Sequence, residues 1–80
     1  MTSYYKDKKV VVIGLARSGI AAVNLLQGAG AKVFVTDSSS NDKLKEVARG
    51  LIRDGIKVEL GAHTLDFIRG KDLVVVSPGV

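Results

Sequence analysis

The chain has 80 residues, of which 46% are hydrophobic and 25% charged, with no cysteine and a formal net charge of +4. These values argue against a disordered chain and exclude a disulfide framework or a thiolate metal site, so we expect one small domain of a cytoplasmic protein. The basic residues are scattered without interleaved aromatic residues, and no apolar run could span a membrane, so we expect neither a nucleic-acid nor a membrane partner.

The first predicted element is a strand over Lys9–Ile13, followed by a glycine-punctuated turn. Four β-branched residues in a row predict a strand buried on both faces, as in a parallel sheet. Residues 14–19 (GLARSG) have the spacing of the dinucleotide-binding fingerprint G-x-G-x-x-G, with alanine at the middle position. Gly14 and Gly19 are the first and third glycines of the fingerprint, which permit the tight turn and the close helix packing. The methyl group of Ala16 would hold a phosphate slightly further out.

Arg17 lies where the first helix is predicted to start. A cation at the positive end of a helix dipole is unfavourable by roughly 0.3–1 kcal/mol, and a bound anion reverses that sign. Arg17 therefore indicates an anion at this helix start, or it is simply a solvated side chain. The helix is predicted from Ser18, a candidate N-cap, to about Ala29, where flanking glycines favour its end.

A second strand is predicted over Lys32–Thr36, ending in Asp37, eighteen residues after Gly19. A carboxylate at this position commonly accepts hydrogen bonds from a nucleoside. The alternative is a surface aspartate in a turn. Ser38 and a second serine follow it, and the absence of Arg or Lys there disfavours an NADP site.

The second predicted helix follows Ser40 or Asn41, either of which can cap it. Its apolar positions have the spacing of one buried helix face. They are Leu44, Val47, Ala48, Leu51 and Ile52. The other side is charged, is interpreted as solvated and is assigned no function: it comprises Lys43, Lys45, Glu46, Arg49 and Arg53.

Three elements complete the chain. They are a strand over Ile56–Leu60, a short helix over Thr64–Arg69 capped by Thr64, and a buried strand over Asp72–Val76. The alternating character of the first of these predicts an edge strand. The exit through residues 77–79 (Ser-Pro-Gly) can offer a backbone N–H to a phosphate, or it is only a turn.

This order of elements predicts an α/β, Rossmann-like, three-layer domain with a parallel four-stranded sheet of order 3-2-1-4. The first and fourth strands then flank the switch point, where a binding crevice opens beside residues 14–19. His63 is the only histidine, and no motif for a catalytic triad, a metal or a phosphate loop accompanies it. The sequence therefore predicts a binding module with no catalytic or metal-ligating residue.

The glycine turn, the strand-end Asp37, the Gly-Ala-His of residues 61–63 and the Ser-Pro-Gly exit together resemble the N-terminal domain of the Mur ligase family, from about Lys9 to Val80. The resemblance implies that the domain binds the UDP moiety of UDP-N-acetylmuramoyl-L-alanine. It also implies that the domain is part of an ATP-dependent ligase that adds D-glutamate in peptidoglycan precursor synthesis. The UDP-binding residues that it implies are Leu15, Ala16, Arg17, Ser18 and the backbone of Gly79 for the diphosphate, and Asp37 and Ser38 for uracil or its ribose.

The family's domain usually continues beyond the Ser-Pro-Gly exit into another strand, so the resemblance implies that the chain is a fragment. It implies that ATP and Mg²⁺ bind in central and C-terminal domains, and that residues 1–80 hold no cofactor and are not catalytic alone. Two alternatives remain open. One is an NAD-binding domain of a dehydrogenase or regulatory protein, favoured by Asp37 and disfavoured by Ala16; the other is a noncatalytic interaction module that binds neither nucleotide.

Overall fold

The structure, a computed structural model, describes residues 4–15 and 17–76, with Arg17 and Ser18 described in their backbone only. Within these residues, strands and helices alternate along the chain. The strands are β1 (Lys9–Ile13), β2 (Lys32–Asp37), β3 (Lys57–Leu60) and β4 (Leu73–Val76), and the helices are α1 (Arg17–Gly28), α2 (Asp42–Arg53) and α3 (Leu65–Ile68). Every predicted element is confirmed, with small differences at the ends.

The four strands form one parallel sheet in the order β3-β2-β1-β4, as predicted. Val12 of β1 pairs with Val35 of β2 and with Val75 of β4. Burial fixes this register, because a slip of one residue would turn each strand's core side chains to the opposite face. The pairing of Ile13 with Thr36 brings the turn after β1 next to the end of β2.

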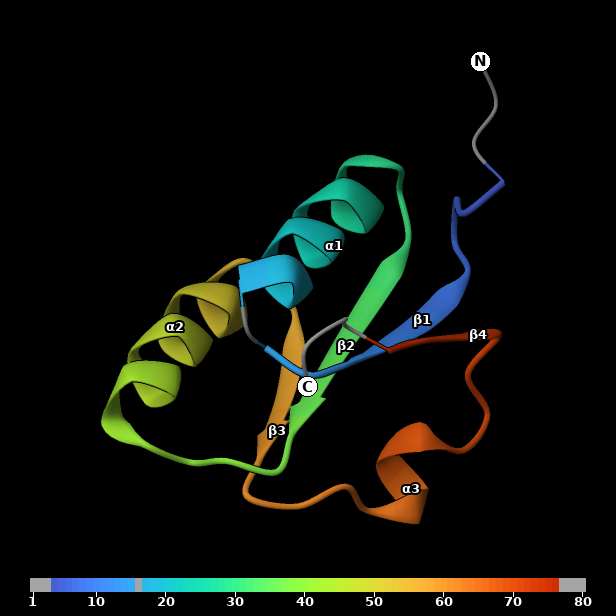
Figure 1. Cartoon of the computed structure of the whole chain (residues 1–80). Helices are drawn as coiled ribbons and strands as arrows, with labels where there is room; N and C mark the ends of the chain where they lie inside the picture. The colour runs from blue at the N-terminus through green and yellow to red at the C-terminus, as the bar shows by residue number, and fades with distance from the viewer. Residues whose placement is uncertain (1–3, 16, 77–80) are drawn as a thin grey trace.

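Helices α1 and α2 cover one face of the sheet, and α3 lies on the other (Figure 1). The core fills the first interface and is made of apolar side chains from the strands and both long helices. Its buried members are Val10, Val12, Leu15, Val23, Leu26, Val33, Val35, Leu51 and Ile56. On the second face, the ring of Phe67 in α3 packs edge-to-face on Phe34 of β2, with centroids 5.9 Å apart.

The prediction that the last strand is buried is wrong for the face of β4 that points away from α1 and α2. Val74 and Val76 of β4 are 51% and 64% exposed, because no helix in the described part of the chain covers them. The prediction that β3 is an edge strand is confirmed by the strand order. Both outer strands of the sheet are therefore partly open to solvent.

The three predicted helix caps have different outcomes. Asn41 caps α2, and its side chain accepts a hydrogen bond from the N–H of Leu44. Ser18 is not the N-cap, because α1 begins one residue earlier, at Arg17, so Ser18 already lies inside the helix. Thr64 occupies the N-cap position of α3, but its side chain makes no capping bond and its hydroxyl donates to Glu59 instead.

Candidate functional site

The side chain of Asp37 ties the glycine turn to the loop between β2 and α2. Its Oδ2 accepts a hydrogen bond of 2.7 Å from the backbone N–H of Leu15, and its Oδ1 accepts one of 2.9 Å from the N–H of Ser39. Asp37 reaches the turn because alternation along β2 gives it the same face as Val33 and Val35, the face that α1 and α2 cover. Since hydrogen bonds to a carboxylate are the stronger kind, this one side chain holds two loops in place.

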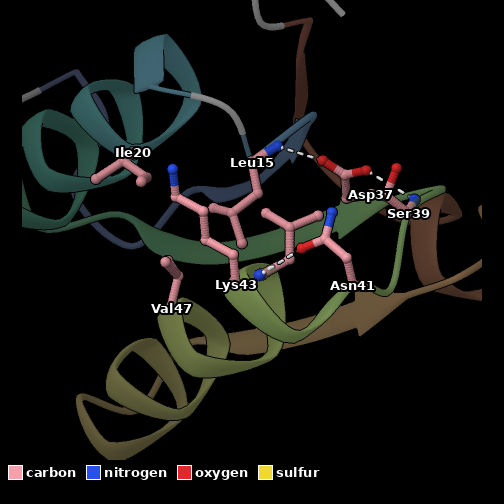
Figure 2. A pocket seen from close by; sticks show the side chains of 8 residues that line it. Leu15, Ile20, Asp37, Ser39, Asn41, Lys43 and Val47 are labelled. Atoms are coloured by element: carbon pink, nitrogen blue, oxygen red, sulfur yellow. Dashed lines mark hydrogen bonds between the residues drawn. The ribbon is translucent and has the colours of Figure 1, made fainter.

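A cavity of about 560 Å³ opens at this edge of the sheet. It lies between the glycine turn, the first turn of α1 and the start of α2 (Figure 2). One part of its lining is apolar and consists of Leu15, Ile20, Leu44 and Val47; the other is polar and consists of Asp37, Ser39, Asn41 and Lys43. The volume is within the usual range for a small-molecule site, and an apolar wall with a few polar groups is typical of such sites.

The wall formed by α2 is fixed by its N-cap. Asn41 has an extended backbone, with φ −69° and ψ 168°, and its Oδ1 accepts a hydrogen bond of 2.9 Å from Leu44. This bond satisfies one of the N–H groups that a helix start leaves without a partner. The cavity therefore lies beside the N-terminal ends of two helices, α1 and α2, where negative charge is favoured.

Of the predicted site residues, the structure brings Leu15 and Asp37 together in the lining of the cavity. The side chain of Leu15 is only 1% exposed and is part of the core, and its N–H is already bonded to Asp37. Gly19 is buried in α1, whereas Ser38 is exposed and does not line the cavity. Ala16, Gly79 and the side chains of Arg17 and Ser18 lie outside the described residues.

Sequence reasoning missed several residues of the cavity. Ser39 lines it in place of Ser38, and Asn41 was considered only as a helix cap. Lys43 was assigned to the solvated side of its helix; it is exposed, yet it also lines the cavity. The available signal was its position two residues after the cap Asn41, since the first turn of a helix that follows β2 lies at the carboxyl edge of the sheet.

A second polar cluster fixes the loop between β3 and α3. Thr36 is completely buried, and its hydroxyl donates to the carbonyl oxygen of Ala62 at 2.9 Å. Its oxygen also lies 2.8 Å from Nδ1 of His63 and 3.3 Å from Oε1 of Glu59. If the one hydroxyl proton is donated to Ala62, the bond to His63 requires the tautomer in which Nδ1 carries the proton. His63 thus anchors a loop in this structure.

Glu59 completes this cluster. Its carboxylate accepts hydrogen bonds from the hydroxyl of Thr64 at 2.7 Å and from the backbone N–H of Thr64 at 3.0 Å. These bonds, with smaller contributions from Thr36 and from the charge of His63, lower the pKa of Glu59 below its ordinary value. Among the described residues, no group of His, Cys, Asp or Glu is placed to hold a metal ion.

A second cavity, of about 440 Å³, lies at the opposite end of the sheet. Its lining includes the first residue of three neighbouring strands, Lys9, Lys32 and Lys57. Among the described residues, its lining includes no carboxylate side chain and no residue of the glycine turn. An anion that binds through positive charge alone is therefore expected to bind at this second cavity, whereas a nucleotide that needs Asp37 is expected at the first.

The fold and the cavity define the class of protein: a Rossmann-like α/β domain with its candidate site at the carboxyl edge of a parallel sheet. Residues 8–80 match the family model of the Mur ligase MurD-like N-terminal domain. The chain belongs to this family. No helix in the described ranges is long and apolar enough to cross a membrane.

Three curated relatives that match this chain share one name. The chain is 47% identical over 75 residues to UDP-N-acetylmuramoylalanine--D-glutamate ligase of Koribacter versatilis, 49% identical over 75 residues to that of Acidobacterium capsulatum, and 40% identical over 80 residues to that of Ligilactobacillus salivarius. These alignments cover 94%, 94% and 100% of this chain. The chain spans only 16–17% of the length of these relatives.

Among solved structures, the chain is similar to bacillithiol disulfide reductase Bdr from Bacillus cereus. The TM-score is 0.70 with 26% sequence identity, and the match covers 94% of this chain and 30% of the reductase. This likeness supports the Rossmann-like fold.

Proposed function

We propose that this domain binds the UDP moiety of UDP-N-acetylmuramoyl-L-alanine as part of an ATP-dependent ligase that adds D-glutamate. The name that these relatives share supports the ligase and its substrate. The observation that carries the binding proposal is the cavity beside the glycine turn, with the Asp37 carboxylate in its lining. Its apolar and polar walls suit a flat heterocyclic base with polar edges.

In this proposal the diphosphate lies at the start of α1. The first N–H groups of a helix have no partner inside the helix, and the helix dipole favours negative charge there. Leu15, Ala16, Arg17 and Ser18 form this seat, and the backbone of Gly79 assists. Leu15 contributes by fixing the turn through its bond to Asp37, and the later residues contribute N–H groups and the positive charge of Arg17.

The nucleoside contacts Asp37 and Ser38. Each oxygen of the Asp37 carboxylate already accepts one backbone N–H, and each has a further lone pair to offer to a ribose hydroxyl or the N–H of uracil. Ser38 is exposed next to this carboxylate, so its hydroxyl is free to face a bound ligand. The bonds from Leu15 and Ser39 hold the carboxylate in one orientation before the ligand arrives, which lowers the cost of binding.

The role of the domain in the proposed ligase is to position the substrate. Binding energy at the nucleotide end, far from the reacting carboxylate, orients the reacting end toward the rest of the enzyme. ATP and Mg²⁺ act in the parts of the ligase that correspond to the remaining length of the relatives, in the cytoplasm. Residues 1–80 contribute no catalytic group.

Calorimetric titration of the 80-residue chain with UDP-N-acetylmuramoyl-L-alanine, UDP and NAD tests this proposal. We expect the two UDP compounds to bind with similar affinity and NAD to bind at least about tenfold more weakly, a difference of about 1.4 kcal/mol. NAD is the relevant competitor because the glycine spacing of residues 14–19 and the strand-end Asp37 also fit an NAD-binding domain. Tighter binding of NAD would favour an NAD-binding domain, and binding of neither nucleotide would favour a noncatalytic interaction module.

A further inference from the structure

Lys43 is the second residue of α2 and lies in the lining of the cavity. Its side chain runs from α2 across the cavity, and the ammonium end points toward Ile20 in the first turn of α1 (Figure 2). A lysine that followed the solvated side of its helix would instead point away from α1. The long apolar stem can lie along Leu44 and Val47, and the charged end near Ile20 stays accessible to solvent because Lys43 is exposed.

The ammonium group of Lys43 has no partner in the described part of the chain. No hydrogen bond, ion pair or ring contact joins it to another described residue. Asp37 is the carboxylate in the same lining, and both of its oxygens accept backbone N–H groups. Among the described residues, Lys43 is therefore the cation in the lining of the cavity, and it forms no ion pair with Asp37.

The location of Lys43 makes an unpaired charge unfavourable. It lies in the first turn of α2, where the helix dipole repels a cation, and it points toward the start of α1, where the dipole is also positive. Asp42 precedes it and offsets only part of this repulsion. An anion bound between the two helix starts would be attracted by both helix dipoles and by the ammonium of Lys43.

We propose that Lys43 contacts a phosphate oxygen of the bound nucleotide and makes the cavity selective for a nucleoside diphosphate over the nucleoside. This inference rests on the proposed function, because the phosphate in question is that of UDP. The diphosphate then lies between the start of α1 and the ammonium of Lys43, with positive charge on both sides. The base and ribose remain with Asp37, so Lys43 discriminates by phosphate alone.

The test compares UDP with uridine as probes, by NMR titration of the 80-residue chain at low ionic strength. The variant is Lys43→Gln, which removes the charge and keeps a similar length and helix propensity. The matched control is Lys45→Gln, the same change two residues further along α2, at an exposed position that does not line the cavity. The folded state of each variant is checked from its amide spectrum before titration.

We expect Lys43→Gln to weaken UDP binding by about 5- to 10-fold, since the lost contact is charge-assisted but partly screened by solvent. Uridine binding should be unchanged, and Lys45→Gln should bind both probes like the unsubstituted chain. Equal UDP affinities of Lys43→Gln and Lys45→Gln would overturn the inference and leave the proposed function standing. An equal loss of UDP and uridine binding would also overturn it. Failure of the unsubstituted chain to bind UDP would overturn the proposed function together with the inference.

Discussion

The carboxylate of Asp37, at the end of β2, accepts a hydrogen bond of 2.7 Å from the backbone N–H of Leu15, in the turn after β1. This contact joins residues that are 22 positions apart in sequence and sets the shape of the cavity at its polar end. The same carboxylate holds Ser39, so one side chain organises two of the loops from which the proposed site is built.

Replacing Asp37 with Asn tests this relationship. Asparagine keeps one acceptor and places an NH₂ group against a backbone N–H, so we expect a loss of about 1–3 kcal/mol in the free energy of unfolding. UDP binding should weaken at least about tenfold, because the lost acceptor also serves the nucleoside. Urea unfolding and UDP titration measure the two effects. The control is Asp66→Asn in α3, an exposed residue distant from this contact, which should change stability by less than about 0.5 kcal/mol.

The buried hydroxyl of Thr36 predicts a second result. Thr36→Val has nearly the same shape but leaves the carbonyl of Ala62 and Nδ1 of His63 without their partner, and we expect it to cost about 2–3 kcal/mol. Thr36→Ser keeps the hydroxyl and loses one methyl group, and we expect it to cost about 1 kcal/mol. Urea unfolding compares them. If valine is tolerated better than serine, packing at this position matters more than the hydrogen bonds.

Glu59 predicts a dependence of stability on pH. Its folded-state pKa is lowered, chiefly by the hydrogen bonds from Thr64, so its contribution to stability is present above the ordinary glutamate pKa. The contribution is lost as the pH falls through the lowered value. Glu59→Gln should therefore be less stable than the unsubstituted chain near neutral pH, and the difference should shrink in acid. Urea midpoints across this pH range measure it, and the matched change Glu46→Gln on the exposed side of α2 should show no such convergence.

The N-cap of α2 predicts a further stability difference. Asn41→Ala removes the acceptor for the N–H of Leu44 and should cost about 1 kcal/mol. Ser40→Ala, at the neighbouring exposed residue that is not the cap, should cost less than about 0.5 kcal/mol. Thermal unfolding of both variants checks the pair. The reverse order would place the start of α2 one residue earlier.

The fold could be predicted from the sequence because local patterns and global topology agree. A run of β-branched residues predicts β1, and the right-handed crossover rule then predicts the order of the whole sheet. Burial of single side chains was less predictable. Ile52 fits the apolar spacing of α2 and yet is 56% exposed, because the core reaches only the side of the helix that faces the sheet.

The site was only partly predictable for a related reason. The glycine spacing and the strand-end carboxylate are local signals, and the structure brings Leu15 and Asp37 together. Lys43 has the local pattern of a solvated helix residue, and its place in the cavity depends on how α2 packs beside α1. The Thr36 cluster depends on contacts between residues 23 to 27 positions apart, which no short motif encodes.

The most direct test of the proposed UDP site is a map of amide chemical-shift changes when the 80-residue chain is titrated with UDP. We predict saturable shifts for Leu15, Gly19, Asp37 and Ser39 at the carboxyl edge of the sheet, and no comparable shifts at its amino end. Shifts confined to Lys9, Lys32 and Lys57, where the second cavity offers positive charge alone, would contradict the account, as would a spectrum that UDP leaves unchanged.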